Sequence, residues 1–360
     1  MYTQGYRKRV TKNSRFVKGA DMSMSNHKKL TGQKGPAIVC IGGGTGLSTL
    51  LRGLKRITPN ITAIVTVSDD GGGSGILRDE LGMPPPGDIR NCMQALSNAE
   101  PVIEKLMDYR FDSGSLSGQS FGNLFLAAIN GISDSFDKAV IKMGEVLSIT
   151  GRVLPVTTDD IHLWAHFEDG SMVVGESKIA AAKNERHSRI KRVELAPGDA
   201  KVLPECVNAI EEANLIVLGP GSLYTSIIPN LLIGGITDAI QNSDALKLYV
   251  CNIMTQPGET DGYSVSEHIR ELFTHAGGKL FDYSLINSKP IPKEILKRYI
   301  DDGAEEVRDD VDLLQETGVE IIRSPVFDTN SILVRHDPNK LAREILRVFY
   351  EKAPTKLYGV

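Results

Sequence analysis

The sequence predicts a doubly wound α/β fold with a mostly parallel sheet and one β-hairpin insertion. Short, continuous apolar runs end near glycine and are followed by segments with apolar residues at helical spacing, which is the pattern of buried parallel strands and their crossover helices. This order recurs along most of the chain after residue 35. One segment in the middle alternates between apolar and polar residues instead, and we expect the hairpin there.

The composition is that of an ordinary globular protein of 360 residues, with 41% hydrophobic and 24% charged residues. No apolar stretch approaches the roughly 18 residues needed to cross a bilayer, and no signal-peptide pattern opens the chain, so we expect a cytoplasmic protein without membrane insertion. The four cysteines are widely spaced and form no CxxC pair, which argues against a disulfide scaffold or a zinc ribbon and predicts buried thiols.

The charge is distributed unevenly, because residues 1–35 hold nine Lys or Arg and the single acid Asp21. This segment lacks hydrophobic periodicity, which predicts a basic, disordered tail in front of one domain that spans residues 36–360. The rest of the chain is acidic and has no overall field that would attract nucleic acid. We therefore expect no nucleic-acid partner, and an anionic ligand would need a local site of backbone N–H groups and a few cations.

The first unit of the predicted fold is strand, helix, strand. Ala37–Ile41 is an apolar run typical of a buried strand, Leu47–Arg56 has helical spacing, and the β-branched run Ile61–Val67 predicts the second strand after a right-handed crossover. Further helices are expected at Asp88–Ser97, Asn123–Asn130 and 135–148.

The middle and the end of the chain supply the hairpin and the second half of the sheet. Ile161–Ser177 alternates and contains an Asp-Gly turn, which predicts a β-hairpin with one solvated face. Later apolar runs predict strands at Leu215–Gly221, Leu246–Ile253, 282–286 and 319–323. Helices are expected at Pro204–Ala213, 264–276, 293–301 and 338–351.

A glycine-rich turn, GGGTG at Gly42–Gly46, separates the first strand from the first helix. Its amides can point with the helix N-terminus at an anion, and glycine lets phosphate oxygens approach the backbone. A tight turn without a ligand is the alternative. The dinucleotide fingerprint fails because Leu47 stands where its third glycine belongs, and no Gly-Lys-Ser/Thr of a P-loop follows, so nicotinamide cofactors and ATP hydrolysis are disfavoured.

Acidic and basic side chains follow the second strand. Asp69 and Asp70 in SDDGGGSG could bond ribose hydroxyls or hold a hydrated Mg²⁺ beside a phosphate, or they could cap the turn. Arg78 and Arg90 lie in the proline-containing segment that follows, where they could form a fixed cationic wall facing a pyrophosphate or make internal salt bridges. The residues alone leave both pairs of alternatives open.

A second glycine turn, GPGSLYTSIIPN, follows a strand in the second half of the chain. The hydroxyls of Ser222, Thr225 and Ser226 near a helix start indicate a second anion pocket, with plain N-caps as the alternative. Both turns would face one crevice if their strands flank a topological switch point. His162 and His166 lie in a strand pattern, so their spacing is not that of helical metal ligands, and we identify no metal site and no nucleophile with an attendant base.

Several long motifs together carry a resemblance to a known family. They are, in chain order, GGGTGLSTLLRGLK, TAIVTVSDDGGGSGILRDELGMPPPGDIRNC, SFGNLFLAA, LPVTT, GPGSLYTSIIPNLL and CNIMTQPGET. From about Pro36 onward the chain resembles the YvcK branch, the gluconeogenesis factors, of the CofD-like family. The resemblance implies a Rossmann-like three-layer fold, binding of UDP-sugars such as UDP-N-acetylglucosamine, links to growth on gluconeogenic carbon sources and to cell-wall morphogenesis and cell shape, and no established catalytic activity.

The resemblance also implies roles for individual residues. Tyr299 and Arg335 match a Tyr and an Arg that the family associates with the nucleotide-sugar site, whereas the residues alone would favour core packing and a surface ion pair. Asp69, Asp70 and Asn123 would line the same cleft. The nucleotide and its phosphates would be bound by Gly43, Gly44, Thr45, Gly219, Gly221, Ser222, Thr225 and Ser226.

The transferase branch of the family is the competing class. It moves a phospholactyl group from a nucleotide donor to a deazaflavin alcohol with Mg²⁺, and it resembles this chain in the first loop and the acidic end of the second strand. SDDGGGSG departs from its histidine-containing continuation, and a single Trp offers little for stacking a flavin, which favours a binding protein. No cofactor is indicated except Mg²⁺ with the nucleotide; a regulatory protein partner is left unidentified, and a homo-oligomer is compatible with the sequence.

Overall fold

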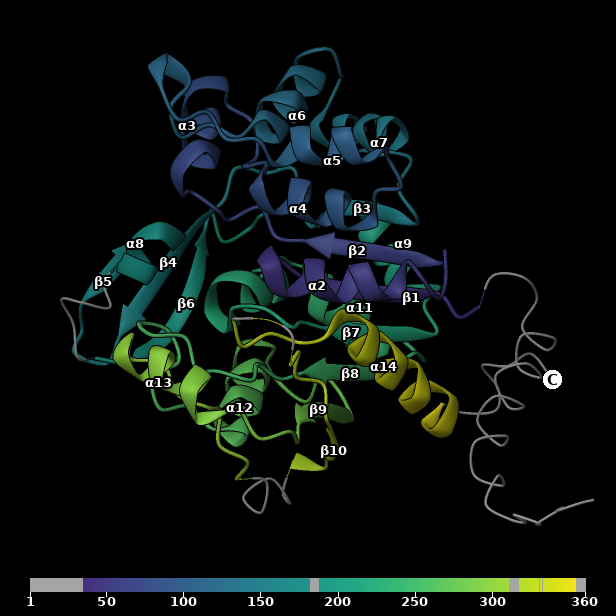
Figure 1. Ribbon diagram of the computed structural model, residues 1–360, viewed down its shortest axis with the longest axis vertical. Coiled ribbons are helices and arrows are strands. Elements are labelled where there is room, and N and C mark those ends of the chain that lie inside the picture. The colour runs from purple at the N-terminus through teal and green to yellow at the C-terminus, as the bar shows by residue number, and fades with distance from the viewer. Residues whose placement is uncertain (1–34, 182–187, 311–316, 330, 332, 354–360) are drawn as a thin grey trace, which may run out of the picture.

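A single parallel sheet organises the molecule (Figure 1). The computed structural model describes residues 35–181, 188–310, 317–329, 331 and 333–353, so the predicted tail lies outside it except for Gly35. Seven strands lie in the order β3-β2-β1-β7-β8-β9-β10, and every adjacent pair is parallel. The strands are β1 (Ile38–Gly42), β2 (Ile61–Val65), β3 (Arg152–Pro155), β7 (Leu215–Leu218), β8 (Leu246–Val250), β9 (Tyr283–Asn287) and β10 (Glu320–Ser324). The order reverses between β1 and β7, which confirms the predicted Rossmann-like, doubly wound fold and places its switch point there.

Helices cover both faces of the sheet and make it the middle of three layers. Figure 1 shows α2 and α14 in front of the strands and α9 and α11 behind them. Strands β1, β2 and β7 are buried along their whole length, because neither face of the sheet meets solvent there. The described helices are α2 (Gly44–Leu54), α3 (Gly72–Leu81), α4 (Gly87–Leu96), α5 (Pro101–Asp108), α6 (Phe121–Gly131), α7 (Phe136–Val146), α8 (Glu176–Ala181), α9 (Pro204–Glu211), α10 (Ile228–Leu231), α11 (Ile236–Asn242), α12 (Val265–His275), α13 (Lys293–Asp301) and α14 (Pro338–Lys352), with a 3₁₀ turn η2 (Gly114–Leu116) and a π turn η4 (Leu223–Ile227).

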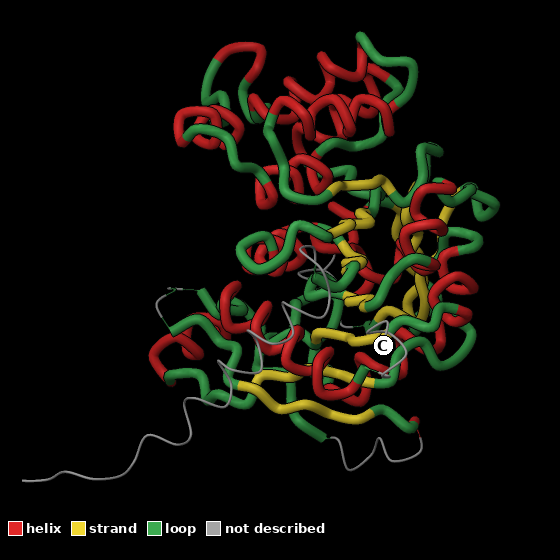
Figure 2. The backbone as a smooth tube through the Cα atoms, turned by 90° about the vertical axis from the view of Figure 1, so that its right-hand side faces the viewer, coloured by secondary structure: helices red, strands yellow, loops and turns green. Residues whose placement is uncertain are grey.

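Helices α3 to α7 form a cap between β2 and β3, and Figure 2 shows it as a group of helices above the strands. Helix α3 was not predicted from the sequence, because glycines occupy much of its first two turns. A Cβ at Gly75 would overlap the backbone carbonyl of Asp70, so glycine is required for this helix to fold against the turn that precedes it. The helix ends at Gly82, whose φ of 62° is a left-handed C-cap.

The predicted hairpin is confirmed and belongs to a small antiparallel sheet, in the order β5-β4-β6. It consists of β4 (His162–Phe167), β5 (Met172–Val174) and β6 (Ile190–Ala196). Strand β6 was not predicted from the sequence. A register irregularity opposite His166 and Phe167 leaves Lys191 and Arg192 both exposed, which breaks the alternation of apolar and polar residues.

The apolar run 332–334 by itself predicts a strand end from which Arg335 would project, and this prediction is wrong. The structure assigns no strand to the described residues of this run, and Leu333 is exposed. The segment instead folds back on residues 327–328: the N–H of Asp328 donates to the carbonyl of Arg335 over 2.9 Å, and Phe327 forms an isolated bridge with His336. This local pairing satisfies the backbone without a place in the sheet.

Two expectations from the composition can be compared with the structure. All four cysteines are buried and unpaired, as predicted. Within the residues that the structure describes, every helix is too short or too polar to cross a membrane.

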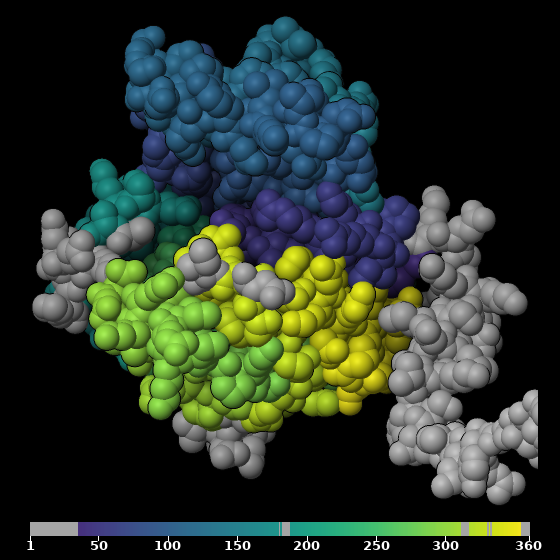
Figure 3. Space-filling model, in the orientation of Figure 1, coloured from purple at the N-terminus to yellow at the C-terminus, as the bar shows by residue number. Residues whose placement is uncertain are grey.

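Figure 3 shows the front face of the molecule, where α2 (purple) adjoins the C-terminal segment (yellow) below the helical cap (blue).

Candidate functional site

The two glycine turns meet at the switch point. A Cβ at Gly46 would lie 2.5 Å from the carbonyl oxygen of Pro220, so the start of α2 touches the turn after β7 and only glycine fits. The side-chain amide of Asn230 donates to the carbonyls of Gly42, over 3.1 Å, and Ser226, over 2.8 Å. Buried between the two turns, it holds the end of β1 and the π turn η4 together as one unit.

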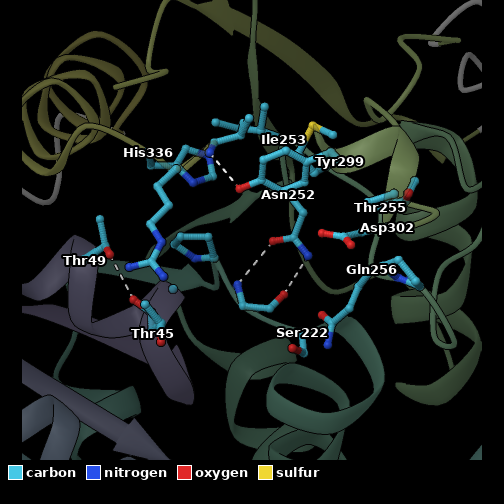
Figure 4. Close-up of a pocket in the computed structure, with 18 residues that line it drawn as sticks. Thr45, Thr49, Ser222, Asn252, Ile253, Thr255, Gln256, Tyr299, Asp302 and His336 are labelled. Carbon is cyan, nitrogen blue, oxygen red and sulfur yellow. Dashed lines mark hydrogen bonds between the residues drawn. The ribbon is translucent and has the colours of Figure 1, made fainter. Parts of the chain in front are cut away.

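A cavity of about 460 Å³ lies beside these turns (Figure 4). Five segments that are far apart in the chain supply its lining: Thr45, Gly46 and Thr49 from α2; Pro220, Gly221 and Ser222 from the second turn; Asn252, Ile253, Met254, Thr255, Gln256 and Pro257 after β8; Tyr299, Asp302 and Ala304 at the end of α13; and Val334, Arg335 and His336. The volume is within the range of ligand pockets, and the position is the crevice at the carboxyl ends of the strands.

The floor of the cavity is held by backbone hydrogen bonds to side chains. Asn252 accepts from the N–H of Gly221 over 3.3 Å and donates to the carbonyl of the same residue over 2.8 Å, as the dashed lines in Figure 4 show. Thr255 is fixed to Glu305, because its backbone N–H donates to the carbonyl of Glu305 over 2.7 Å and its hydroxyl accepts from the N–H of Glu305 over 2.9 Å. The first pair of bonds fixes the turn after β7 relative to the segment after β8, and the second fixes that segment to the residues after α13.

The opposite wall comes from α13 and the segment around Arg335. The hydroxyl of Tyr299 accepts the N–H of Val334 over 2.8 Å, which docks this segment on the helix. Arg335 is exposed, and its guanidinium makes no hydrogen bond or ion pair with a described residue, so it is available to a ligand. Burial lowers the pKa of His336 to about 4, although a bond with the backbone of Cys251 opposes this shift, so this imidazole is neutral.

Carboxylates of the protein itself cap both helix N-termini at the switch point. The backbone N–H of Gly44 donates to Asp88, and those of Tyr224 and Thr225 donate to Glu259. Burial raises the pKa of each carboxyl to about 7. Of the residues expected to bind phosphate, Gly44 and Thr225 therefore already have a carboxyl partner for their amides, and a ligand's phosphates must rely on other donors.

Asp69 and Asp70 do not line the cavity. They belong to an acidic cluster that also contains Asp88 and Glu176. Asp69 accepts from the N–H of Gly71 over 2.8 Å, and Asp70 accepts from the first turn of α8 over 2.8 Å, so both cap local turns. Burial raises the pKa of Glu176 well above its usual range, and repulsion from Asp88 and Asp69 adds to the shift. The described residues include no group of three or more His, Cys, Asp or Glu side chains arranged to hold a metal, so a Mg²⁺ ion here would also need ligand oxygens.

Three other candidate residues make internal contacts in the helical cap. Buried Arg78 pairs with Asp160 and donates to the carbonyl of Ile161 over 2.6 Å, which is the internal salt bridge that the sequence left open. Arg90 donates to a backbone carbonyl at the end of α5 over 3.4 Å. Asn123 donates to a serine hydroxyl of α3 over 3.3 Å. All three hold α3, α4 or α6 in place rather than lining the cavity.

The structure thus divides the residues that the sequence singled out. The cavity is lined by Thr45, Gly221, Ser222, Tyr299 and Arg335, while Gly43, Gly44, Gly219, Thr225 and Ser226 lie in the turns without lining it. Asn252, Gln256 and His336 also line the cavity and were not predicted from the sequence. The signal for the first two was their place in CNIMTQPGET, directly after the predicted strand at β8, since strand ends share one edge of the sheet.

Comparisons with known proteins identify the family. The family model described as 2-phospho-L-lactate transferase CofD matches residues 38–327. The chain belongs to the CofD family. Within it, a protein of Thermoanaerobacterium thermosulfurigenes is 56% identical over 87% of this chain and 96% of its own length. The gluconeogenesis factor of Bacillus subtilis is 48% identical over 89% of this chain and 100% of its own length.

A solved structure supports the same assignment. The crystal structure of a UPF0052-family protein from Bacillus halodurans matches this CofD-family chain with a TM-score of 0.84 and 46% sequence identity, covering 88% of this chain and 100% of that one. The resemblance inferred from the motifs is therefore confirmed at the level of family and fold.

Proposed function

We propose that this CofD-family protein is a regulatory protein that binds a UDP-activated sugar, such as UDP-N-acetylglucosamine, without consuming it. The proposal depends mainly on one observation, the cavity at the switch point, which is lined by an arginine without a described partner, by hydroxyl groups and by an aromatic ring. Nucleotide ligands of doubly wound sheets bind at this crevice. Among the described lining residues, no serine or threonine hydroxyl is hydrogen-bonded to a histidine or a carboxylate, which supports binding rather than nucleophilic catalysis.

Each part of the cavity suits one part of such a ligand. The guanidinium of Arg335 would contact the pyrophosphate or the uracil, and the hydroxyls of Thr45 and Ser222 would donate to phosphate oxygens. Tyr299 offers a ring face for the base, because its hydroxyl is already bonded to the backbone. Mg²⁺ could accompany the phosphates, with the ligand supplying oxygens.

The cellular role is proposed from the relatives. Proteins of similar length and sequence are named gluconeogenesis factors. We propose that this chain acts in the cytoplasm, is needed for growth on gluconeogenic carbon sources and for cell-wall morphogenesis and cell shape, and transmits the level of its ligand to a regulatory protein partner.

Calorimetry combined with product analysis tests the binding proposal. Titration with UDP-N-acetylglucosamine should release saturable heat, and chromatography of the mixture should recover the nucleotide sugar intact. Release of UDP during the incubation would make the protein an enzyme. An absence of heat at millimolar ligand would contradict both binding and turnover.

A second candidate is a CofD-type transferase, which would move a phospholactyl-type group from a nucleotide donor to a flavin-like alcohol with Mg²⁺. The family model's description and the acidic cluster around Asp69 and Glu176 favour it. The assay is incubation with a phospholactyl nucleotide, a deazaflavin alcohol and Mg²⁺. Formation of a phosphodiester on the flavin would support transfer, and recovery of both substrates would leave the binding function.

A further inference from the structure

We infer that Gln256 is the residue by which the cavity recognises the sugar of its ligand, and that buried Glu259 is the positioning residue that orients it. This inference rests on the proposed binding of a UDP-sugar and adds which protein atom selects the sugar. Gln256 lies in the segment after β8 and lines the cavity half-buried. Its backbone is fully used within its own turn, because its N–H donates to the Thr260 hydroxyl over 2.8 Å and its carbonyl accepts from Glu259 and Thr260.

The side-chain amide of Gln256 has only one group left for a ligand. Its Nε2 donates to Oε1 of Glu259 over 2.6 Å, whereas its Oε1 makes no hydrogen bond with a described residue. Oε1 of Glu259 also accepts from the Thr225 hydroxyl over 3.3 Å, so two side chains donate to this oxygen. Because Nε2 is bound to Glu259, Gln256 presents its carbonyl oxygen to the cavity.

The surroundings of Gln256 suit a neutral hydrogen-bond donor and not a phosphate. Glu259 lies directly behind it, and the charge of Glu259 contributes to the raised pKa of Glu176 in the acidic cluster. Phosphate oxygens would be repelled by Glu259 when it is ionised, and at Gln256 they would find an acceptor where they need a donor. A hydroxyl or an acetamido N–H of a sugar is uncharged and can donate a hydrogen bond to Oε1 of Gln256.

The position within the cavity agrees with this assignment. Figure 4 shows the side chain of Gln256 beside Ser222, across the cavity from Tyr299 and His336. With the uracil at Tyr299 and the pyrophosphate at the central hydroxyls, the sugar extends to the side of Gln256. Glu259 makes the contact selective, because a glutamine that could rotate would offer its amino group equally well.

The test compares the affinities for UDP and for UDP-N-acetylglucosamine, measured by calorimetry. In Gln256→Leu we expect the affinity for UDP-N-acetylglucosamine to fall by about five- to tenfold and that for UDP to stay the same, because one hydrogen bond to the sugar is lost. Gln241→Leu is the matched control, since Gln241 is exposed and its side chain, among the described residues, donates only to the carbonyl of Lys279 over 3.5 Å. It should leave both affinities unchanged.

Glu259→Gln tests the positioning role. The amide introduced at position 259 can donate as well as accept, so the side chain of Gln256 can bind it in either orientation. The preference for UDP-N-acetylglucosamine over UDP should therefore fall as in Gln256→Leu. The double variant should lose no further preference. A merely structural role for Glu259 would instead weaken both ligands together, and equal melting temperatures of the variants would show that folding is intact.

The outcomes separate this inference from the proposed function. If the wild-type protein binds neither ligand, the proposed function fails and this inference with it. If it binds UDP and UDP-N-acetylglucosamine equally, or if Gln256→Leu keeps the wild-type preference, the proposed function stands and Gln256 does not recognise the sugar. An equal loss of both affinities in Gln256→Leu would likewise overturn the inference by assigning Gln256 to the nucleotide.

Discussion

At the scale of single residues, Arg335 should separate binding from folding. In Arg335→Ala we expect the affinity for UDP-N-acetylglucosamine to fall about 10- to 100-fold, because a charge-assisted bond contributes about 1.5–3 kcal/mol. The free energy of unfolding should change by no more than about 0.5 kcal/mol, since the side chain is exposed and has no described polar partner. Calorimetry and thermal melts measure the two effects.

Arg78→Ala is the contrasting arginine variant. Arg78 is buried and joins α3 to Asp160 and Ile161, so its loss should destabilise the fold by about 1–3 kcal/mol while the folded fraction binds normally. The assignment of Arg335 is wrong if Arg335→Ala binds as the wild type does, or if it loses binding only because it unfolds. Reduced binding by a fully stable Arg78→Ala would return Arg78 to the ligand site.

Asp88 should make stability depend on pH. The pKa of its carboxyl is raised, by burial first, from 3.8 to about 7 in the folded state, so the folded protein holds this proton more tightly than the unfolded chain. The destabilisation is therefore absent below pH 3.8, grows as the pH rises to about 7, and is then constant. Asp88→Asn keeps an oxygen acceptor for Gly44 without the charge, so it should be more stable than the wild type at pH 8 and nearly equal at pH 4.

Urea unfolding of both proteins at the two pH values measures this effect. A variant that is less stable at pH 8 would mean that the ionised carboxylate stabilises the N-terminus of α2 by more than its burial costs.

At the scale of elements, the packing of α14 on α2 depends on Gly53. A Cβ there would overlap the carbonyl of Pro338 and lie 2.9 Å from the Cβ of Ala342. Gly53→Ala should therefore reduce the free energy of unfolding by about 1–3 kcal/mol. Gly131→Ala is the control: a Cβ there has no neighbour within 4 Å, and the change should be neutral or stabilising by up to about 1 kcal/mol. Equal melting temperatures for both variants would contradict this packing.

The elements that the sequence predicted well are those with one dominant local signal. β1, β2, β7 and β8 are short, mostly apolar runs that are covered on both faces of the sheet. The Asp-Gly turn indicated the hairpin of β4 and β5. Local rules failed where tertiary contacts decide. The first turns of α3 are rich in glycine because they pack on the preceding turn, and β6 is irregular because it follows a shift in its partner.

The same distinction holds for the candidate site. The glycine turns and the hydroxyls of Thr45 and Ser222 were found because strand–turn–helix units reveal anion sites locally. The capping of these turns by Asp88 and Glu259 could not be predicted, because each carboxyl comes from a distant segment. Predicting Gln256 as a lining residue requires the order of the strands in the sheet, because that order brings the segment after β8 next to the turn after β7.

At the scale of the whole molecule, the cavity exists only when five distant segments are folded together, so a ligand bound there should stabilise the entire fold. UDP-N-acetylglucosamine at 100 times its dissociation constant should add about 2.7 kcal/mol to the free energy of unfolding. Thermal melts at increasing ligand concentration measure this shift. Binding by calorimetry without a rise in melting temperature would mean that the ligand binds the unfolded chain equally well.

The basic N-terminal segment should be dispensable for both stability and ligand binding. The N–H of Ala37 donates to the side chain of Asn214 over 2.9 Å, and the carbonyl of Ala37 accepts from Asn214 and Leu215, so the chain is fixed to the sheet from this residue onward. Deletion of residues 1–34 keeps these bonds and all of the cavity lining. We expect an unchanged melting temperature and an unchanged affinity for UDP-N-acetylglucosamine, and limited proteolysis of the full chain should cut this segment first. A fall of several degrees in the melting temperature, or weaker binding, would instead mean that the nine cations of the segment contact the acidic body of the protein.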